Sequence, residues 1–263
     1  MSAVVDIDWV VLGLFFATLL IPFALSRYYQ LQIGKELFVS VSRMTAQLAL
    51  VGIYLEYLFK INSLILNLLW LIAMILIGAS AIVGKARLPK KKLMLPVTLG
   101  LVVGLLPLLL VICLAIIQPT PFYNAQYLIP LAGMLLGNCL SGNIVALQNM
   151  FTCLEQRKAE YEGALSLGAS PRYATLPFVR EALQKSLSPS LASMSTTGLV
   201  TLPGMMTGQI LGGASPIIAI KYQLMIMVAI FVMLSISIAI TLSLTVRNSI
   251  HQNGRVMIAL SKK

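Results

Sequence analysis

The sequence predicts an all-α membrane protein, a polytopic transmembrane helical bundle with about seven spans. Of its 263 residues, 59% are hydrophobic and 10% are charged, whereas soluble domains are about 45–50% apolar and about 25% charged. The hydrophobic residues gather in runs of about 20, the length that a helix needs to cross the hydrocarbon core. We therefore expect a single transmembrane domain over residues 1–263, inserted as a multi-pass protein.

Hydrophobic runs define the expected spans. They cover residues 9–26, 37–59, 63–84, 93–117, 127–147, 191–213 and 217–246. The last run is long enough to tilt or to extend into the cytoplasm. The second contains Arg43, Gln47 and Glu56, so a full crossing there is less certain from hydropathy alone.

Positive charge sets the expected orientation. The net charge is +11, but the basic residues lie between apolar runs without interleaved aromatic residues, so we expect no nucleic-acid partner. Cytoplasmic loops collect Lys and Arg, and the connection 85–92 carries five such residues. Alternation from that loop places the N-terminus outside and the C-terminus in the cytoplasm. The cytoplasmic side then holds Arg27, Lys35, Lys85, Arg87, Lys90, Lys91, Lys92, Arg157, Lys158, Arg172, Arg180, Lys185, Arg247, Arg255, Lys262 and Lys263, and the outer side Lys60 and Lys221.

One sizeable segment, residues 148–190, is expected to lie in the cytoplasm between the fifth and sixth spans. Gly168 is a good helix stop, Ser170 a good N-cap and Pro171 a good first helical residue. The pattern predicts a helix, a sharp turn, a short helix over 171–176, and a further helix after Pro177. Such an elbow could be a docking element or a re-entrant linker.

A resemblance favours docking. Glu162-Gly-Ala-Leu-Ser-Leu-Gly168 followed by a helix and Leu176-Pro177 resembles the EAA loop of ATP-binding-cassette (ABC) transporter permeases, although Gly163 replaces the usual first alanine. In that family the short helix docks into a groove of a separate ATPase subunit. The resemblance implies coupling roles for Glu162, Gly163, Ala164, Gly168, Ala169, Ser170, Pro171 and Arg172.

Further segments extend the resemblance. Residues 43–47 (RMTAQ), 130–138 (PLAGMLLGN), 165–170 (LSLGAS), 198–208 (GLVTLPGMMTG) and 219–223 (AIKYQ) are similar to the bacterial iron-export permease family, which includes plant membrane proteins of aluminium tolerance. The match covers about residues 35–246. It implies a non-enzymatic transport subunit in the plasma (inner) membrane, with iron as cargo and a role in metal homeostasis and resistance to oxidative stress.

The same resemblance implies the partners. We expect a homodimer in the lipid bilayer that engages an ABC ATPase subunit, with no cofactor bound by this chain and with ATP and Mg²⁺ on the partner ATPase. The sequence agrees independently, because it contains no G-x-x-x-x-G-K-[ST] phosphate loop. Active pumping would therefore need another chain.

Polar residues inside the spans are the candidate pathway residues. Arg43 and Gln47 are one helical turn apart and share a face. An arginine in hydrocarbon costs about 2.5–3.5 kcal/mol on insertion scales, so it should face protein or water, either as a clamp on neighbouring carbonyls or beside the pathway. Glu56 precedes Lys60 by four residues, which favours a surface ion pair over a cation ligand.

Asn138 and Asn143 follow Gly133-x-x-x-Gly137 near the cytoplasmic end of the fifth span. Small residues allow close helix approach, and amides can hydrogen-bond across it. These two residues could hold helices together or line the inner pathway.

Residues 200–216 place helix-breaking residues within an apolar run. Gly204, Gly208 and Gly212 repeat every four residues, and Pro203 removes a backbone donor. Such backbone is tolerated at membrane depth only where protein or a water-filled cavity covers it. The stretch could be a kinked helix at the dimer seam, or Met205, Met206 and Gln209 could contact cargo. As metal ligands Met205, Met206 and Glu56 are weak candidates, because thioethers suit Cu(I) better than hard cations.

Other function classes stay open. The cargo of an ABC permease could instead be a nucleotide-sugar, and a passive channel would need no ATPase. An intramembrane enzyme would need a catalytic constellation, and the single His251 lies in the polar tail.

Overall fold

The fold is all-helical in its regular elements, as predicted. The structure is a computed structural model that describes residues 6–31 and 33–250. The chain runs through α1 (Trp9–Phe16), η1 (Ala17–Leu19), α2 (Leu20–Tyr28), α3 (Gly34–Ile61), α4 (Leu64–Lys85), α5 (Lys90–Val111), η2 (Ile112–Ile117), α6 (Ala125–Gln156), α7 (Lys158–Ser166), α8 (Pro171–Thr196), α9 (Gly204–Leu211) and α10 (Pro216–Ser249). Here α1, η1 and α2 form one continuous helical rod, and η2 is a π-helical turn that ends α5.

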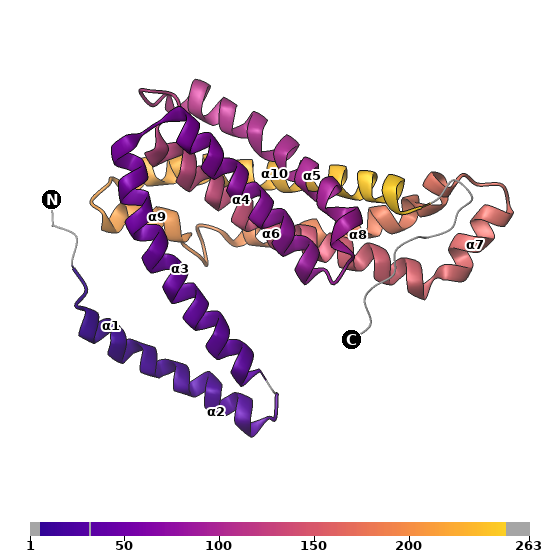
Figure 1. The fold of residues 1–263 in the computed structure, drawn as a ribbon, viewed down its shortest axis with the longest axis horizontal. Helices are drawn as coiled ribbons and strands as arrows, with labels where there is room; N and C mark the ends of the chain where they lie inside the picture. Colours follow the sequence, from indigo (N-terminus) through magenta and orange to yellow (C-terminus); the bar gives the residue numbers. More distant parts are fainter. Residues whose placement is uncertain (1–5, 32, 251–263) are drawn as a thin grey trace.

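The connections between helices gather at two opposite ends of the molecule. In Figure 1 the α3–α4, η2–α6 and α9–α10 connections lie toward the left end, and the α4–α5 connection, α7 and the end of α10 lie toward the right. The right-hand end carries the basic connection Lys85–Lys92, so the positive-inside rule predicts that this end is cytoplasmic. Arg255, Lys262, Lys263 and His251 lie outside the described residues.

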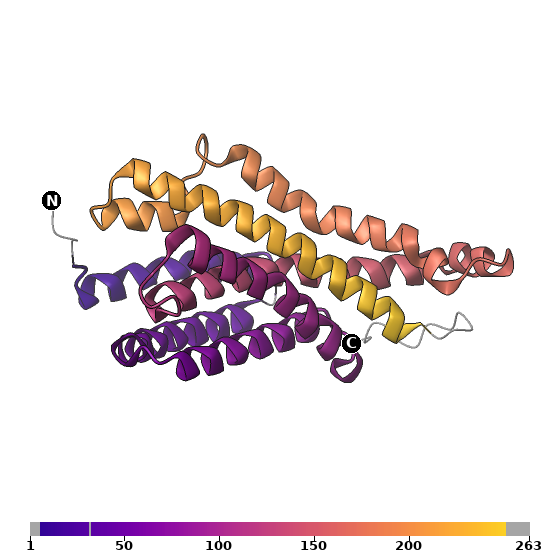
Figure 2. The same ribbon diagram turned by 90° about the horizontal axis from the view of Figure 1, so that it is seen from above.

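Six helical segments of the described chain are long and apolar enough to cross a membrane. They are Trp9–Tyr28, Gly34–Ile61, Leu64–Lys85, Lys90–Ile117, Ala125–Gln156 and Pro216–Ser249. The seventh expected span, 191–213, is not a continuous helix: α8 ends at Thr196, residues 197–203 are non-helical, and α9 begins at Gly204. Figure 2 shows α8, the break and α9 following one another toward the left end, with α10 returning beside them.

The predicted short helix over 171–176 is also wrong. Helix α8 continues through Pro177 and Pro189 to Thr196. Each proline removes one backbone donor, but Phe178 and Ala182 are buried against the rest of the protein, and α8 packs along α6 and α10. Packing over this length offsets the loss of two helical hydrogen bonds.

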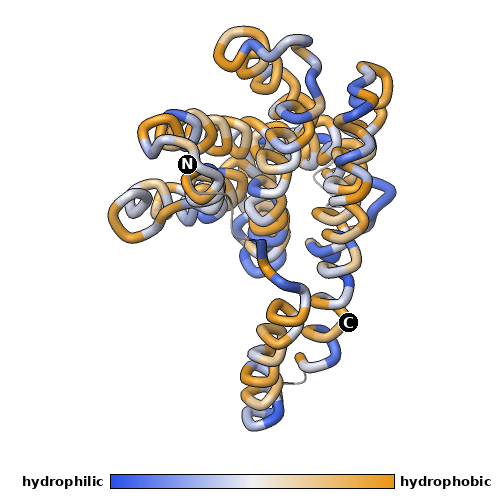
Figure 3. The backbone as a smooth tube through the Cα atoms, turned by 90° about the vertical axis from the view of Figure 1, so that its left-hand side faces the viewer, coloured by the Kyte–Doolittle hydropathy of each residue, from blue (hydrophilic) through white to orange (hydrophobic). Residues whose placement is uncertain are grey.

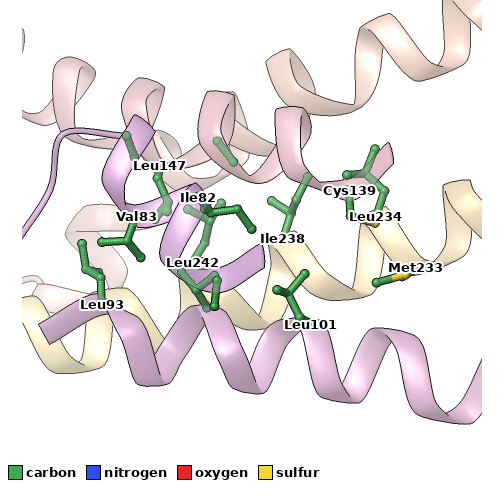
Figure 4. Packing of buried hydrophobic residues seen from close by; sticks show 14 of the residues in the cluster. Ile82, Val83, Leu93, Leu101, Cys139, Leu147, Met233, Leu234, Ile238 and Leu242 are labelled. Carbon is green, nitrogen blue, oxygen red and sulfur yellow. The ribbon is translucent and has the colours of Figure 1, made fainter. Parts of the chain in front are cut away.

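The core lies where α4, α5, α6, α8 and α10 meet. Figure 4 shows how Ile82, Leu101, Leu147, Ile238 and Leu242 interdigitate between four of these helices. Helices α5 and α10 approach most closely at glycines of α5. A methyl group on Gly100 would overlap the hydroxyl oxygen of Thr241, and one on Gly104 would stand 3.1 Å from the carbonyl oxygen of Met233.

Helices α1 to α3 form an arm that stands apart from this bundle (Figure 1). The end of α3 joins the bundle through a second cluster in which Leu58 packs with Ala125 and Ile129, and the Tyr54 and Trp70 rings lie 4.4 Å apart. Most hydrophobic side chains of the arm are exposed, and Figure 3 shows that apolar residues predominate along the helices. This surface is that of a protein solvated by lipid.

Candidate functional site

The predicted coupling residues form a tight elbow between α7 and α8. Helix α7 ends in a Schellman motif, in which the Gly168 amide donates to the Leu165 carbonyl at 2.9 Å and the Ala169 amide to the Ala164 carbonyl at 3.0 Å. Gly168 has φ +89°, the left-handed conformation that side chains disfavour. The Ser170 hydroxyl then accepts from the Tyr173 amide at 3.3 Å, which caps α8 at Pro171.

The elbow turns one face inward and another outward. Ala164 and Ala169 pack against the main core, whereas Glu162, Gly163 and Arg172 are exposed. The most exposed apolar side chains at the tip are Leu167, 91% exposed, and Tyr173, 71% exposed. These two side chains lie at the same end of the molecule as the basic connection Lys85–Lys92.

An ion-pair network fixes the elbow to its supporting helices. The Arg157 guanidinium, at the α6–α7 joint, donates two hydrogen bonds of 2.7 Å to Glu160 of α7 and one of 3.0 Å to Glu181 of α8. It also lies over the Phe178 ring, 5.1 Å from the centroid. Lys185 contacts the other Glu181 oxygen at 2.7 Å. One residue thus ties three helices together.

The hydrogen bonds of this network favour the charged forms of its side chains. The hydrogen bond from Lys185 is the main cause that lowers the pKa of Glu181, and the bond to Glu160 is the main cause that raises the pKa of Arg157. The pairs within one helix could be read from their spacing of three or four residues. The bond between Arg157 and Glu181, 24 residues apart, could not.

A groove runs beside the elbow. It has a volume of about 720 Å³ and lies between the first turns of α8 and the last turns of α10. Leu176, Val179 and Leu244 line it, with Arg172 and Arg247 among its charged residues. The elbow and the groove together make the cytoplasmic surface of this end partly apolar and basic.

Of the two predicted asparagines, Asn143 is buried and Asn138 is exposed. The Asn143 amide donates to the Cys139 carbonyl at 2.9 Å and to the Ser237 hydroxyl at 3.1 Å, which joins α6 to α10. Asn138 bonds the Met134 carbonyl of its own helix at 2.8 Å. The geometry at Asn143 is that of helix packing, and a pathway role for either residue stays a prediction.

The helix-breaking stretch is unwound rather than kinked. Pro203 precedes α9, and Gly204 is its first residue. A methyl group on Gly204 or Gly208 would meet no atom within 4 Å, so this glycine face is not closely packed within one protomer. Met205 packs against the main core, Met206 and Gln209 are partly buried, and the buried Gln209 Oε1 has no hydrogen-bond partner among the described residues.

Arg43 and Gln47 lie on α3, away from the other candidates, and both are exposed. Glu56 forms the expected ion pair with Lys60, at 2.8 Å and with both side chains 72% exposed. The structure therefore brings together the coupling residues at one end and the 203–209 residues near the other, but not the whole predicted set. Over the described part of the chain, no three His, Cys, Asp or Glu residues are grouped as metal ligands.

Comparison with known proteins identifies a family that includes membrane proteins. Residues 9–250 match the uncharacterised protein family UPF0014. No solved structure matches the chain.

Curated relatives agree with this match. A membrane protein of that family from Synechocystis, slr1647, is 35% identical over 86% of this chain and 87% of its own length. The protein Aluminum Sensitive 3 of Arabidopsis thaliana is 37% identical over 79% and 75%, and the probable iron export permease protein FetB of Escherichia coli is 29% identical over 96% of each. With its apolar helices, the chain is a multi-pass plasma-membrane protein, and it belongs to the UPF0014 family.

Proposed function

We propose that this protein is the membrane-spanning permease subunit of an ABC transporter that exports a metal cation, with iron as the first cargo to test. It would work as a homodimer, and a separate ATPase would bind ATP and Mg²⁺ and dock on the elbow around Gly168. The name of the Escherichia coli relative supports iron export. The name of the Arabidopsis relative refers to aluminium, which keeps the cargo within metal cations.

The observation that carries the proposal is the elbow itself. Leu167 and Tyr173 present an apolar surface at the cytoplasmic end, and Arg157 holds the elbow to α6 and α8. A docking site must transmit force to the spans as well as bind. Because α8 runs from the elbow into the bundle and α7 joins the elbow to α6, a displacement of the elbow would be passed on to the bundle through both helices.

The ATPase role can be tested at Gly168. The substitution Gly168→Val introduces a β-branched side chain at φ +89° without meeting any atom within 4 Å, so its effect is on the backbone. A left-handed conformation costs a non-glycine residue about 1–2 kcal/mol. We expect weaker co-purification of the ATPase and less stimulation of ATP hydrolysis. Gly52→Val is the matched control, because Gly52 is helical and also has no atom within 4 Å.

The cargo is tested separately, in liposomes that contain the permease and its ATPase. ATP-dependent movement of Fe²⁺ is expected, and it should fall with Gly168→Val but not with Gly52→Val. Equal ATPase stimulation in the two variants would refute docking at the elbow. Stimulation without any Fe²⁺ movement would refute the cargo and leave the permease assignment standing.

A further inference from the structure

The crossing made by α8, the break and α9 is unusually polar. Among the described helices of 18 residues or more, α8 is the one that is not apolar enough for a lipid-facing span. Residues 186–197, the end of α8 and the residue that follows it, carry seven hydroxyl side chains. Ser188, Ser193, Ser195 and Thr196 are exposed, and we call Ser188, Ser195 and Thr196, together with the break 197–203, the hydroxyl face.

We expect the hydroxyl face to lie at membrane depth. Helix α9 has eight residues and is therefore about 12 Å long at 1.5 Å per residue. Counted from the outer end of the molecule, the break comes after α9. A depth of about 12 Å lies inside a hydrocarbon core of about 30 Å. The last turns of α8 come next, so they share this depth.

The break exposes backbone that lipid cannot satisfy. Within the described chain, the carbonyl groups of Leu199 and Val200 and the amide group of Leu202 have no hydrogen-bond partner. Leu199 is 91% exposed and Val200 is 79% exposed, so the protomer does not cover them. Irregular backbone at this depth occurs only where protein or water meets it.

The neighbouring hydroxyls make the same face polar. Ser188 donates to the Gln184 carbonyl at 2.6 Å, Ser195 to the Ala192 carbonyl at 2.8 Å and Thr196 to the same carbonyl at 3.2 Å. Their protons are thus engaged within α8, which leaves oxygen lone pairs toward the outside. Leu191 is the one large apolar side chain between Ser188 and Thr196 that is exposed, and Leu199, Val200 and Leu202 of the break are exposed as well.

We propose that the hydroxyl face lines a water-filled cargo pathway. This inference rests on the proposed function and adds the residues and their chemistry. Hydroxyl and main-chain carbonyl oxygens are neutral, hard donors that suit a partly hydrated metal cation. Several weak sites in a row bind cargo and release it. Met205, by contrast, is partly buried against the core.

Thiol accessibility tests the pathway in the complete transporter, in proteoliposomes. The native cysteines Cys113, Cys139 and Cys153 are buried and are first replaced by alanine. Ser195→Cys and Leu199→Cys are then treated with a charged, membrane-impermeant thiol reagent. The control is Ile72→Cys on α4, which is 54% exposed and lies eight residues from the outer start of its helix, a depth of about 12 Å.

We expect both pathway cysteines to react at least tenfold faster than the Ile72 variant, because a thiolate forms in water and not in lipid. We also expect Ser195→Ala combined with Thr196→Val to slow ATP-dependent Fe²⁺ movement while ATPase stimulation persists. Reaction as slow as at Ile72, in the presence and absence of ATP, would overturn the pathway even if Fe²⁺ moves. Fast reaction without Fe²⁺ transport would support the water-filled pathway and refute the cargo instead.

Discussion

The contact between α5 and α10 allows a quantitative test of the fold. A methyl group on Gly100 would overlap the Thr241 hydroxyl oxygen and stand 2.7 Å from the Ser237 carbonyl oxygen. The carbonyl is backbone and cannot rotate away, so Gly100→Ala must separate the helices. Overpacking costs about 1–3 kcal/mol, while alanine recovers about 1 kcal/mol of helix propensity, which gives a net loss of up to about 2 kcal/mol.

Two other glycines provide graded controls. A methyl group on Gly104 would lie 3.1 Å from a backbone oxygen of α10, whereas one on Gly78 of α4 would find its nearest atom, in the Leu140 side chain, at 3.7 Å. Gly78→Ala is therefore expected to be neutral or stabilising by up to about 1 kcal/mol. Gly104→Ala should fall between Gly78→Ala and Gly100→Ala.

The free energy of unfolding in detergent micelles measures this series. Titration with a denaturing detergent, followed by circular dichroism, gives the free energy of unfolding of each alanine variant. Each value is compared with that of the native protein under identical conditions. If Gly100→Ala proved as stable as Gly78→Ala, the close approach of α5 and α10 would be wrong, whatever the stability of Gly104→Ala.

Three further predictions concern polar contacts. Asn143→Ala should cost about 1–3 kcal/mol because it leaves Ser237 of α10 without its partner, and the loss should shrink in a Ser237→Ala background when both are measured by unfolding. Glu181 has a lowered pKa in the folded protein, so its stabilising effect is present above its ordinary value of 4.5 and is lost as pH falls below it; the native protein should lose stability between pH 5 and 3 more steeply than Glu181→Gln. Glu56→Gln removes an exposed helical ion pair and should change the unfolding free energy by no more than about 0.5 kcal/mol.

The spans and the elbow could be predicted because local chemistry determines them. A continuous crossing needs about 20 apolar residues, and that requirement locates α4 and α5 to within a few residues. Gly168, Ser170 and Pro171 signal a helix stop and start by their own conformational preferences, and the structure has both at these residues.

The errors arose where tertiary packing decides. Pro177 signals a helix end, but burial of Phe178 keeps α8 continuous. G-x-x-x-G spacing occurs at Gly204 and Gly208, where no atom of the same protomer packs against the glycines. It also occurs at Gly100 and Gly104, where α10 packs tightly against them. The same spacing in two contexts cannot show which one meets a neighbour. The hydrogen bond from Arg157 to Glu181 of α8 was not predicted, because only the folded arrangement of α6 and α8 brings these two residues together.

Two glycines with φ of +90°, Gly198 and Gly213, bracket α9. Each can act as a hinge, because glycine adopts positive and negative φ angles at similar energetic cost. An eight-residue helix has little stability of its own, and contacts with α10 hold it in place. We therefore expect α9 to open more readily than α8 and α10. Its amide protons should exchange with solvent before those of the long helices on either side.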